Sequence, residues 1–179
     1  EMNLAAVKLA RDLADEYTAK NPDKPRFVAG SVGPTNKTCS MSPDVNNPAY
    51  RALSYDELAA SYQQQMEAML EGGVDAILIE TIFDTLNAKA AIFAAEQAMK
   101  ATGVEVPVML SVTVSDIGGR TLSGQTLDAF LASVQHANIF SVGLNCSFGA
   151  RQLKPFLEQL AARAPYYISA YPNAGLPNS

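Results

Sequence analysis

Residues 76–114 read AILIETIFDTLNAKAAIFAAEQAMKATGVEVPVMLSVTV, and they combine two apolar runs with a helical pattern between them. The runs Ala76–Ile79 and Val108–Val114 are nearly continuous, which is typical of strands buried on both faces of a parallel sheet. Between the runs, apolar residues recur at helical spacing, after Asp84 as a predicted N-cap and before Gly103 as a predicted helix stop. The segment therefore predicts one strand–helix–strand unit.

The same alternation extends in both directions along the chain. Three more apolar runs predict strands, at Phe27–Val32, Phe140–Leu144 and Tyr166–Ala170. Helical patterns lie between them, and one opens with a predicted capping box of Ser54 and Glu57. Right-handed strand–helix–strand units build either an open α/β sheet or a (β/α)8 barrel. Because a complete barrel takes about 250 residues, five strands in 179 residues correspond to an open sheet or to five-eighths of a barrel.

Three local expectations accompany this pattern. Pro155 fits a helix only near its first turn, so the last helix should begin around Lys154 or earlier. The single histidine, His136, should lie late in the preceding helix, where the helix dipole favours a positive charge. The polar stretch between Gly33 and Ser54 should form a loop of about twenty residues, and loops of that length are usually functional or disordered.

Composition excludes several classes of protein. The net charge of −5 and the sequence pI of about 4.8 argue against a nucleic-acid surface, and no apolar stretch approaches the roughly 18 residues of a membrane span. Two cysteines are too few for a disulfide framework, so we expect a reduced, cytoplasmic protein. Because the sequence opens almost inside a helical pattern and closes on a loop-like NAGLPNS, we expect residues 1–179 to be one fragment of a larger domain.

Polar side chains follow the predicted strands at the ends where parallel α/β proteins place their active sites. Glu80 directly ends an apolar run, and a carboxylate there needs a ligand cation, hydrogen bonds from loop amides or a role as cap of the following helix, because burying it alone is costly. The full set at these strand ends is Ser31, Gly33, Thr35, Glu80, Thr81, Ser115, Asp116, Asn145, Cys146, Pro172 and Asn173.

Cys146 also ends a strand, and the residues alone leave its role open. A free cysteine is most often a small buried hydrophobe. A nucleophilic role would need a nearby histidine, and His136 is predicted at the opposite end of the following strand. A metal site would need more thiols or histidines than these strand ends supply, and nothing in the spacing of Cys39 brings it there. The glycine-rich stretch SDIGGR (115–120) lacks phosphate-loop spacing and is interpreted as a turn.

Five blocks of sequence carry a family resemblance. They are GSVGPT (30–35), ILIETIFDTLNAKAA (77–91), GRTLSGQT (119–126), GLNCSFGA (143–150) and YPNAGLPN (171–178). In order and spacing they resemble the homocysteine-binding module of cobalamin-dependent methionine synthases, from Arg26 to Ser179. The NAKAA and PNAGLPN blocks resemble the cobalamin-dependent enzymes more than their betaine-using relatives.

The resemblance implies a partial (β/α)8 TIM barrel whose five parallel strands correspond to strands three to seven. It implies a zinc ion held by three cysteine thiolates, of which Cys146 would be the first. The other two belong to a Gly-Gly-Cys-Cys-Gly motif that this sequence does not contain. Glu80 would hold the ammonium group of homocysteine, and Asn173 would be an amide able to occupy the open zinc position when substrate is absent. Asn145 is interpreted as an orienting group beside the site, and Cys39 as a loop or packing residue.

The implied reaction is methyl transfer from methylcobalamin, and ultimately from methyltetrahydrofolate, to zinc-bound homocysteine, giving methionine. Cobalamin and folate would be held by other modules of the same polypeptide. The 179-residue chain alone should be inactive and should bind zinc weakly. Two alternatives remain: a non-catalytic or self-associating α/β module that pairs through open sheet edges, or an unrelated barrel lyase that uses Glu80 and Asp116 as acid and base.

Overall fold

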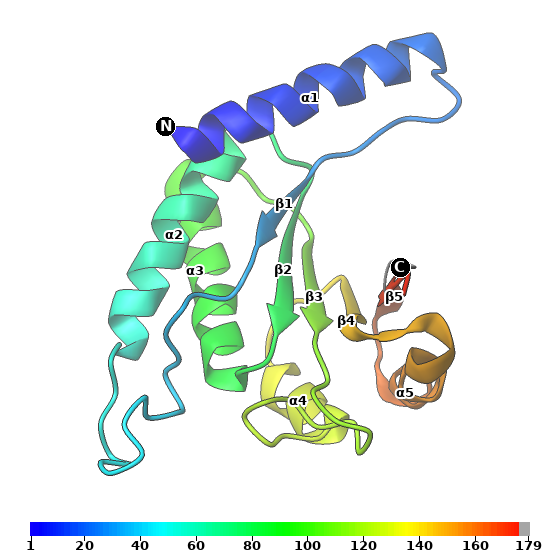
Figure 1. The fold of residues 1–179 in the computed structure, drawn as a ribbon. Coiled ribbons are helices and arrows are strands. Elements are labelled where there is room, and N and C mark those ends of the chain that lie inside the picture. The colour runs from blue at the N-terminus through cyan, green and yellow to red at the C-terminus, as the bar shows by residue number, and fades with distance from the viewer. Residues whose placement is uncertain (176–179) are drawn as a thin grey trace.

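The computed structural model describes residues 1–175, so the last part of the YPNAGLPN block lies outside the described residues. Five strands form one parallel sheet in the order β1-β2-β3-β4-β5, which confirms the predicted α/β fold (Figure 1). In chain order the elements are α1 (Met2–Lys20), β1 (Ala29–Val32), α2 (Tyr55–Glu71), β2 (Ala76–Ile82), α3 (Thr85–Thr102), β3 (Val108–Val112), α4 (Leu127–Val134), β4 (Ser141–Gly149), α5 (Ala150–Arg163) and β5 (Tyr167–Asn173).

The core lies between the helices and one face of the sheet. Val32, Ile79, Leu110 and Val142 stand side by side in register on neighbouring strands, and each is at most 3% exposed. Helices α2 and α3 pack against each other and against β1 and β2 (Figure 1). Since side chains alternate along a strand, residues such as Leu78 point to the other face, where they are only half-buried.

The predicted helix boundaries at α2 and α3 are confirmed. The Ser54 hydroxyl accepts from the Glu57 amide at 3.3 Å, while the Glu57 carboxylate accepts from the Ser54 amide at 2.9 Å. The Asp84 carboxylate accepts from the Leu86 amide at 2.9 Å, and Gly103 ends α3 with a left-handed φ of 71°. These residues fix the direction in which each helix leaves its strand.

The predicted end of the fourth strand is wrong. The strand β4 runs to Gly149 rather than Leu144, with an irregular register between Asn145 and Gly149. Within that irregularity, Cys146 and Ser147 adopt left-handed φ values of 60° and 56°. A polar, glycine-containing stretch carries no apolar pattern, so periodicity could not reveal that pairing with β5 resumes beyond the irregularity.

Two expectations about helix ends have different outcomes. The last helix, α5, begins at Ala150, which confirms a start earlier than Lys154, but Pro155 lies in its second turn rather than its first. The expectation that His136 lies late in a helix is wrong, because α4 ends at Val134 and the chain turns through a hydrogen bond from the Ala137 amide to the Val134 carbonyl. No helix within residues 1–175 has the length and apolar composition needed to cross a membrane.

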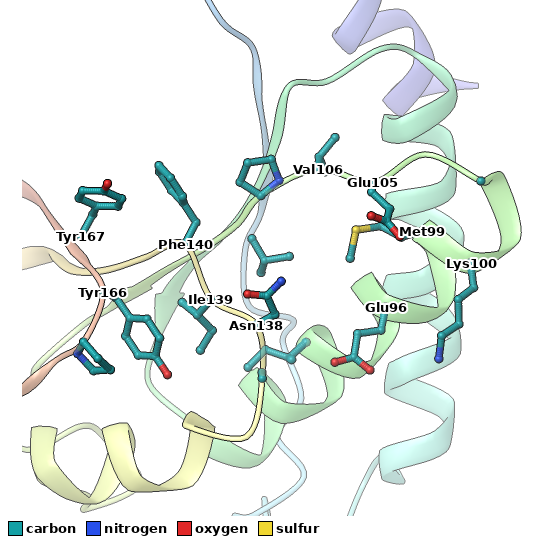
Figure 2. Close-up of a pocket in the computed structure, with 16 residues that line it drawn as sticks. Glu96, Met99, Lys100, Glu105, Val106, Asn138, Ile139, Phe140, Tyr166 and Tyr167 are labelled. Carbon is teal, nitrogen blue, oxygen red and sulfur yellow. The ribbon is translucent and has the colours of Figure 1, made fainter.

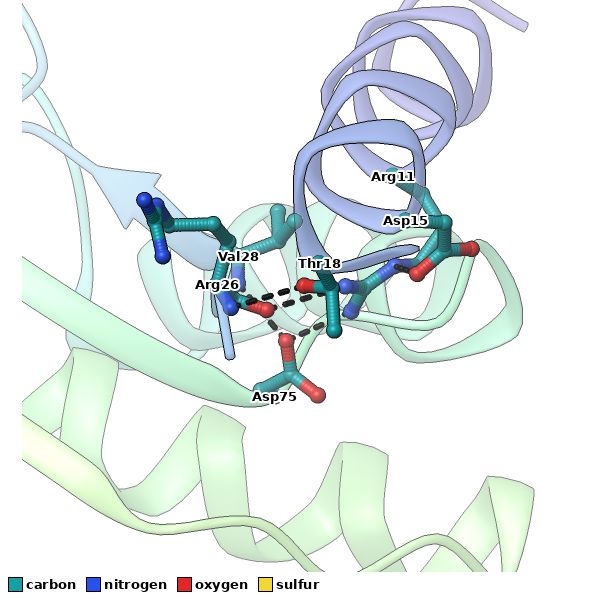
Figure 3. Close-up of polar contacts among 6 residues, drawn as sticks. All are labelled: Arg11, Asp15, Thr18, Arg26, Val28 and Asp75. Atoms are coloured by element: carbon teal, nitrogen blue, oxygen red, sulfur yellow. Dashed lines mark hydrogen bonds and ion pairs between the residues drawn. The ribbon is translucent and has the colours of Figure 1, made fainter. Parts of the chain in front are cut away.

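A partly buried ion pair between Arg11 and Asp75 attaches the first helix to the sheet (Figure 3). Asp75 Oδ2 accepts from Arg11 Nη1 and from the Val28 amide, both at 2.6 Å. Arg11 Nη2 also donates to the Arg26 carbonyl at 3.3 Å, and the hydrogen bond to Asp75 raises the pKa of Arg11. One carboxylate therefore links α1, the start of β1 and the start of β2.

Replacing Asp75 by alanine should lower the free energy of unfolding by about 1–3 kcal/mol, because the Val28 amide and the Arg11 guanidinium both lose their partner. Urea denaturation would measure the change. The matched control is Asp15→Ala, which removes the other carboxylate that pairs with Arg11. Because the Asp15 side chain is 67% exposed, this variant should lower the free energy of unfolding by less than about 0.5 kcal/mol. Equal losses for the two variants would contradict this account of the α1 attachment.

Candidate functional site

The carboxyl ends of β2, β3 and β4 meet around the side-chain amide of Asn145. Asn145 Oδ1 accepts from the Ser111 hydroxyl at 2.7 Å and from the Thr81 amide at 3.2 Å. Asn145 Nδ2 donates to Thr81 Oγ1 at 3.0 Å and to Cys146 Sγ at 3.1 Å. The structure thus brings Thr81, Asn145 and Cys146 together, as their positions at strand ends predict, and adds Ser111.

Left-handed backbone conformations occur at the same cluster around Asn145. Among the described residues, the non-glycine residues with positive φ are Thr81 at 57°, Cys146 at 60° and Ser147 at 56°. The left-handed region costs an ordinary residue roughly 1–2 kcal/mol, and such strain is most often kept at functional sites. Two of these three residues are hydrogen-bonded to the Asn145 side chain. The Cys146 thiol is exposed, whereas Asn145 is only 4% exposed.

Glu80 lies on β2, half-buried, next to the β1 strand. The Ser31 hydroxyl donates a hydrogen bond to Glu80 Oε1. The partner found is therefore a neighbouring hydroxyl, rather than the loop amides or cation that the sequence left open. One hydroxyl does not use all the acceptor positions of a carboxylate, so Glu80 can still accept from a ligand ammonium group.

The long loop after β1 contains neither helix nor strand, and the start of α3 holds it in place. Asn87 Oδ1 accepts from the Cys39 amide at 2.8 Å, and Asn87 Nδ2 donates to the Lys37 carbonyl at 3.1 Å. The Asp84 carboxylate accepts from the Ser40 amide and hydroxyl. Burial raises the pKa of the Cys39 thiol, which agrees with a packing role for this residue. The loop is thereby fixed against the same end of the sheet as Glu80.

Other strand-end residues are not part of these contacts. Asp116 Oδ1 accepts from the Arg120 amide at 3.0 Å within its own loop, which confirms that residues 115–120 form a turn. Thr35 is bonded locally to Lys37. Asn173 is exposed on β5, in register with Gly149. His136 precedes β4 whereas Cys146 lies near its carboxyl end, so the two are at opposite ends of one strand.

The residues present do not form a complete metal site. Within residues 1–175, no three histidine, cysteine, aspartate or glutamate side chains are grouped so that they could hold a metal ion. A catalytic zinc usually takes three protein ligands and keeps one open position. Cys146 supplies one exposed thiol of the suitable chemical type, and the structure offers no second thiol beside it because Cys39 is buried in the loop.

A groove that the sequence did not predict lies at the opposite end of the sheet. It has a volume of about 1320 Å³ and opens between the second half of α3 and the segments that lead into β3, β4 and β5 (Figure 2). Its lining is partly apolar, with Met99, Ile139, Phe140 and Tyr166, and partly charged, with Glu96. Because it is at the amino ends of the strands, it is separate from the cluster around Asn145.

Comparison with known proteins gives one family and one fold. A family model described as homocysteine S-methyltransferase matches residues 1–179. Two solved structures of the homocysteine methyltransferase MmuM from Escherichia coli are similar to the chain. The apo form has 24% sequence identity and a TM-score of 0.76 over 97% of this chain and 60% of that one. The metallated form has 23% identity and a TM-score of 0.77 over 97% and 58%. The chain thus spans about three-fifths of the length of these structures and shares their barrel-like fold.

Proposed function

The chain belongs to the homocysteine S-methyltransferase family, and on that premise we propose that it is part of an enzyme that methylates the sulfur of homocysteine. The observation that carries the proposal is the exposed Cys146 thiol at the carboxyl end of β4, held there by a buried amide. In this class of fold, the carboxyl ends of the strands are where catalytic groups gather. Glu80 lies at the same end of the sheet, two strands away.

We propose that the parent enzyme is a methionine synthase that uses methylcobalamin. The support is the resemblance of the NAKAA and PNAGLPN blocks to the cobalamin-dependent enzymes. On this proposal methyltetrahydrofolate is the ultimate methyl source, and the cobalamin and folate modules are partners within the same polypeptide. A reduced cytoplasmic location agrees with two free cysteines, one buried and one exposed.

Three residues receive roles in this proposal. Cys146 is one of three thiolate ligands of a zinc ion, and the other two thiolates come from sequence that this chain does not include. Glu80 accepts from the ammonium group of homocysteine. Asn173 is an amide that reaches the metal when substrate is absent. Support for a metal comes from the relative MmuM, which has been solved in a metallated form.

An observation on β5 favours one alternative as a second candidate. Tyr167 is 71% exposed and Tyr171 is 52% exposed, so the last strand presents aromatic surface together with an open edge. Exposed parallel edges invite pairing with another chain. A self-associating module would give a concentration-dependent mass in sedimentation equilibrium, whereas a monomer at high concentration would exclude it.

The substrate role of Glu80 can be tested in an enzyme that carries this chain within a complete site. Glu80→Gln should weaken homocysteine binding by about 10- to 100-fold, because the ion pair between carboxylate and ammonium becomes a hydrogen bond from the ammonium to an uncharged amide. Calorimetric titration would measure the change. The desamino analogue of homocysteine, which lacks the ammonium group, should bind both proteins equally.

A matched control variant is Glu96→Gln, which changes a glutamate in the groove at the opposite end of the sheet. It should leave homocysteine affinity unchanged. If Glu80→Gln binds homocysteine as tightly as the parent protein does, Glu80 is not the ammonium site, and the proposed role is wrong.

A further inference from the structure

We infer that Asn145 is a positioning residue whose side-chain amide fixes the direction of the Cys146 sulfur. The functional meaning of this inference rests on the proposed function, since a fixed thiol matters most for a metal ligand. The geometry itself does not depend on any metal. It follows from four hydrogen bonds that join three neighbouring strands beneath one exposed sulfur.

The hydrogen bonds determine which way the amide points. A side-chain amide has two acceptor positions on oxygen and two donors on nitrogen, and here each of the four is used. The Thr81 backbone amide can only donate, so it selects the oxygen of Asn145. Exchanging oxygen and nitrogen would place two donors against each other at Thr81. The nitrogen must therefore face the sulfur of Cys146.

The amide is anchored far more firmly than the thiol that it holds. Asn145 is 4% exposed and Ser111 is fully buried, while Cys146 is exposed. The Asn145 backbone is also held, because Thr113 Oγ1 donates to its carbonyl oxygen at 3.2 Å. A donor on a rigid support can hold an exposed side chain in one rotamer, which a surface thiol would not otherwise keep.

The backbone conformations fit the same interpretation. Thr81 and Cys146 both have left-handed φ values, and both contact the Asn145 side chain. The Asn145 hydrogen bonds offset part of the cost of the two strained conformations. Groups that orient a metal ligand in this way are typically worth 10- to 100-fold in metal affinity.

The decisive variant is Asn145→Asp, which nearly preserves the shape of the side chain. It retains an oxygen that accepts from Ser111 and from the Thr81 amide, but it puts an acceptor where the donor to Cys146 was. The readout is the set of Hα–Hβ couplings of Cys146 in the NMR spectrum, measured under reducing conditions without metal or homocysteine. We expect one χ1 rotamer in the unsubstituted chain and averaged couplings in the variant.

Two companion variants complete the test. Ser111→Ala removes the anchor of Asn145 Oδ1 but leaves the donor, so it should give partial averaging and answers the question if Asn145→Asp does not fold. Asn138→Asp makes the same chemical change at an exposed residue of the distant groove and should leave the Cys146 couplings unaltered.

Averaged couplings in the unsubstituted chain, or one unchanged rotamer in both Asn145→Asp and Ser111→Ala, would overturn the inference. Both variants are needed because the carboxylate of Asn145→Asp can accept from the Cys146 thiol, whereas Ser111→Ala introduces no such bond. If Asn145→Asp does not fold, one unchanged rotamer in Ser111→Ala would overturn it instead. Because no metal or substrate is present, these results are independent of the proposed function. A chain that shows the fixed rotamer but belongs to an enzyme without methyl transfer to homocysteine would refute the proposed function and leave the positioning role in place.

Discussion

Gly143→Ala is expected to lower the free energy of unfolding by about 3 kcal/mol or more, at the upper end of the range for an overpacked core. A β-carbon at this position would lie 2.1 Å from Ser169 Oγ and 2.2 Å from the Ser169 carbonyl oxygen. A rotamer change could move the hydroxyl, but the carbonyl belongs to the backbone of β5. The two strands would therefore have to separate, and the whole edge of the sheet beside Asn145 would shift.

Urea denaturation measures this loss, and the same strand supplies its control. Gly149→Ala adds an identical methyl group to β4 at φ −72°, with its nearest neighbour at an ordinary 3.7 Å. That variant should change stability by less than about 0.5 kcal/mol, as surface substitutions away from special features usually do. If both variants lose the same amount, the close approach of β4 and β5 is not what limits residue 143.

Cys146→Ser should reduce methyl transfer by more than about 100-fold in an enzyme that carries this chain within a complete site, since supporting residues alone account for 10- to 100-fold. A serine hydroxyl is not deprotonated at neutral pH and is a poor zinc ligand. Zinc content should therefore fall together with activity. The measurements are metal analysis of the purified protein and the rate of methionine formation.

The control for this prediction is the other cysteine. Cys39 is only 7% exposed, and its backbone amide and carbonyl, not its thiol, hold it in the loop. Cys39→Ser should therefore retain zinc. Full zinc occupancy in Cys146→Ser would show that Cys146 is not a ligand. In that case its left-handed backbone and its contact with Asn145 would need another explanation.

Much of the fold could be predicted from the sequence because its signals are local. Continuous apolar runs mark the strands, and Asp84 and Gly103 limit α3 on either side. The expectation that every strand is buried on both faces is wrong, because only β3 and the first half of β4 are, while β1 and β2 are buried on one face and β5 is mostly exposed. The irregular part of β4 could not be predicted in the same way. Pairing across Cys146 and Ser147 depends on contacts with β5, and no pattern within the residues 145–149 indicates that the strand resumes.

The candidate site was predictable to the extent that it depends on strand ends. Glu80, Asn145 and Cys146 each follow or end an apolar run, so parallel topology places them on one side of the molecule. Ser111 was missed because it sits within the apolar run VMLSV and is fully buried. A serine inside such a run is the signal that could have found it, since most buried hydroxyls have a hydrogen-bond partner.

The most direct test of the central claim is zinc content with and without homocysteine, under reducing conditions. It should be measured on this chain and on a version extended at both ends to include the further barrel strands and the two further cysteines that the proposed function requires. We expect about one zinc in the extended protein, with a metal environment that changes on adding homocysteine, and little or none in the 179-residue chain. An extended protein that holds no zinc and does not bind homocysteine would contradict the assignment of Cys146 as a zinc ligand.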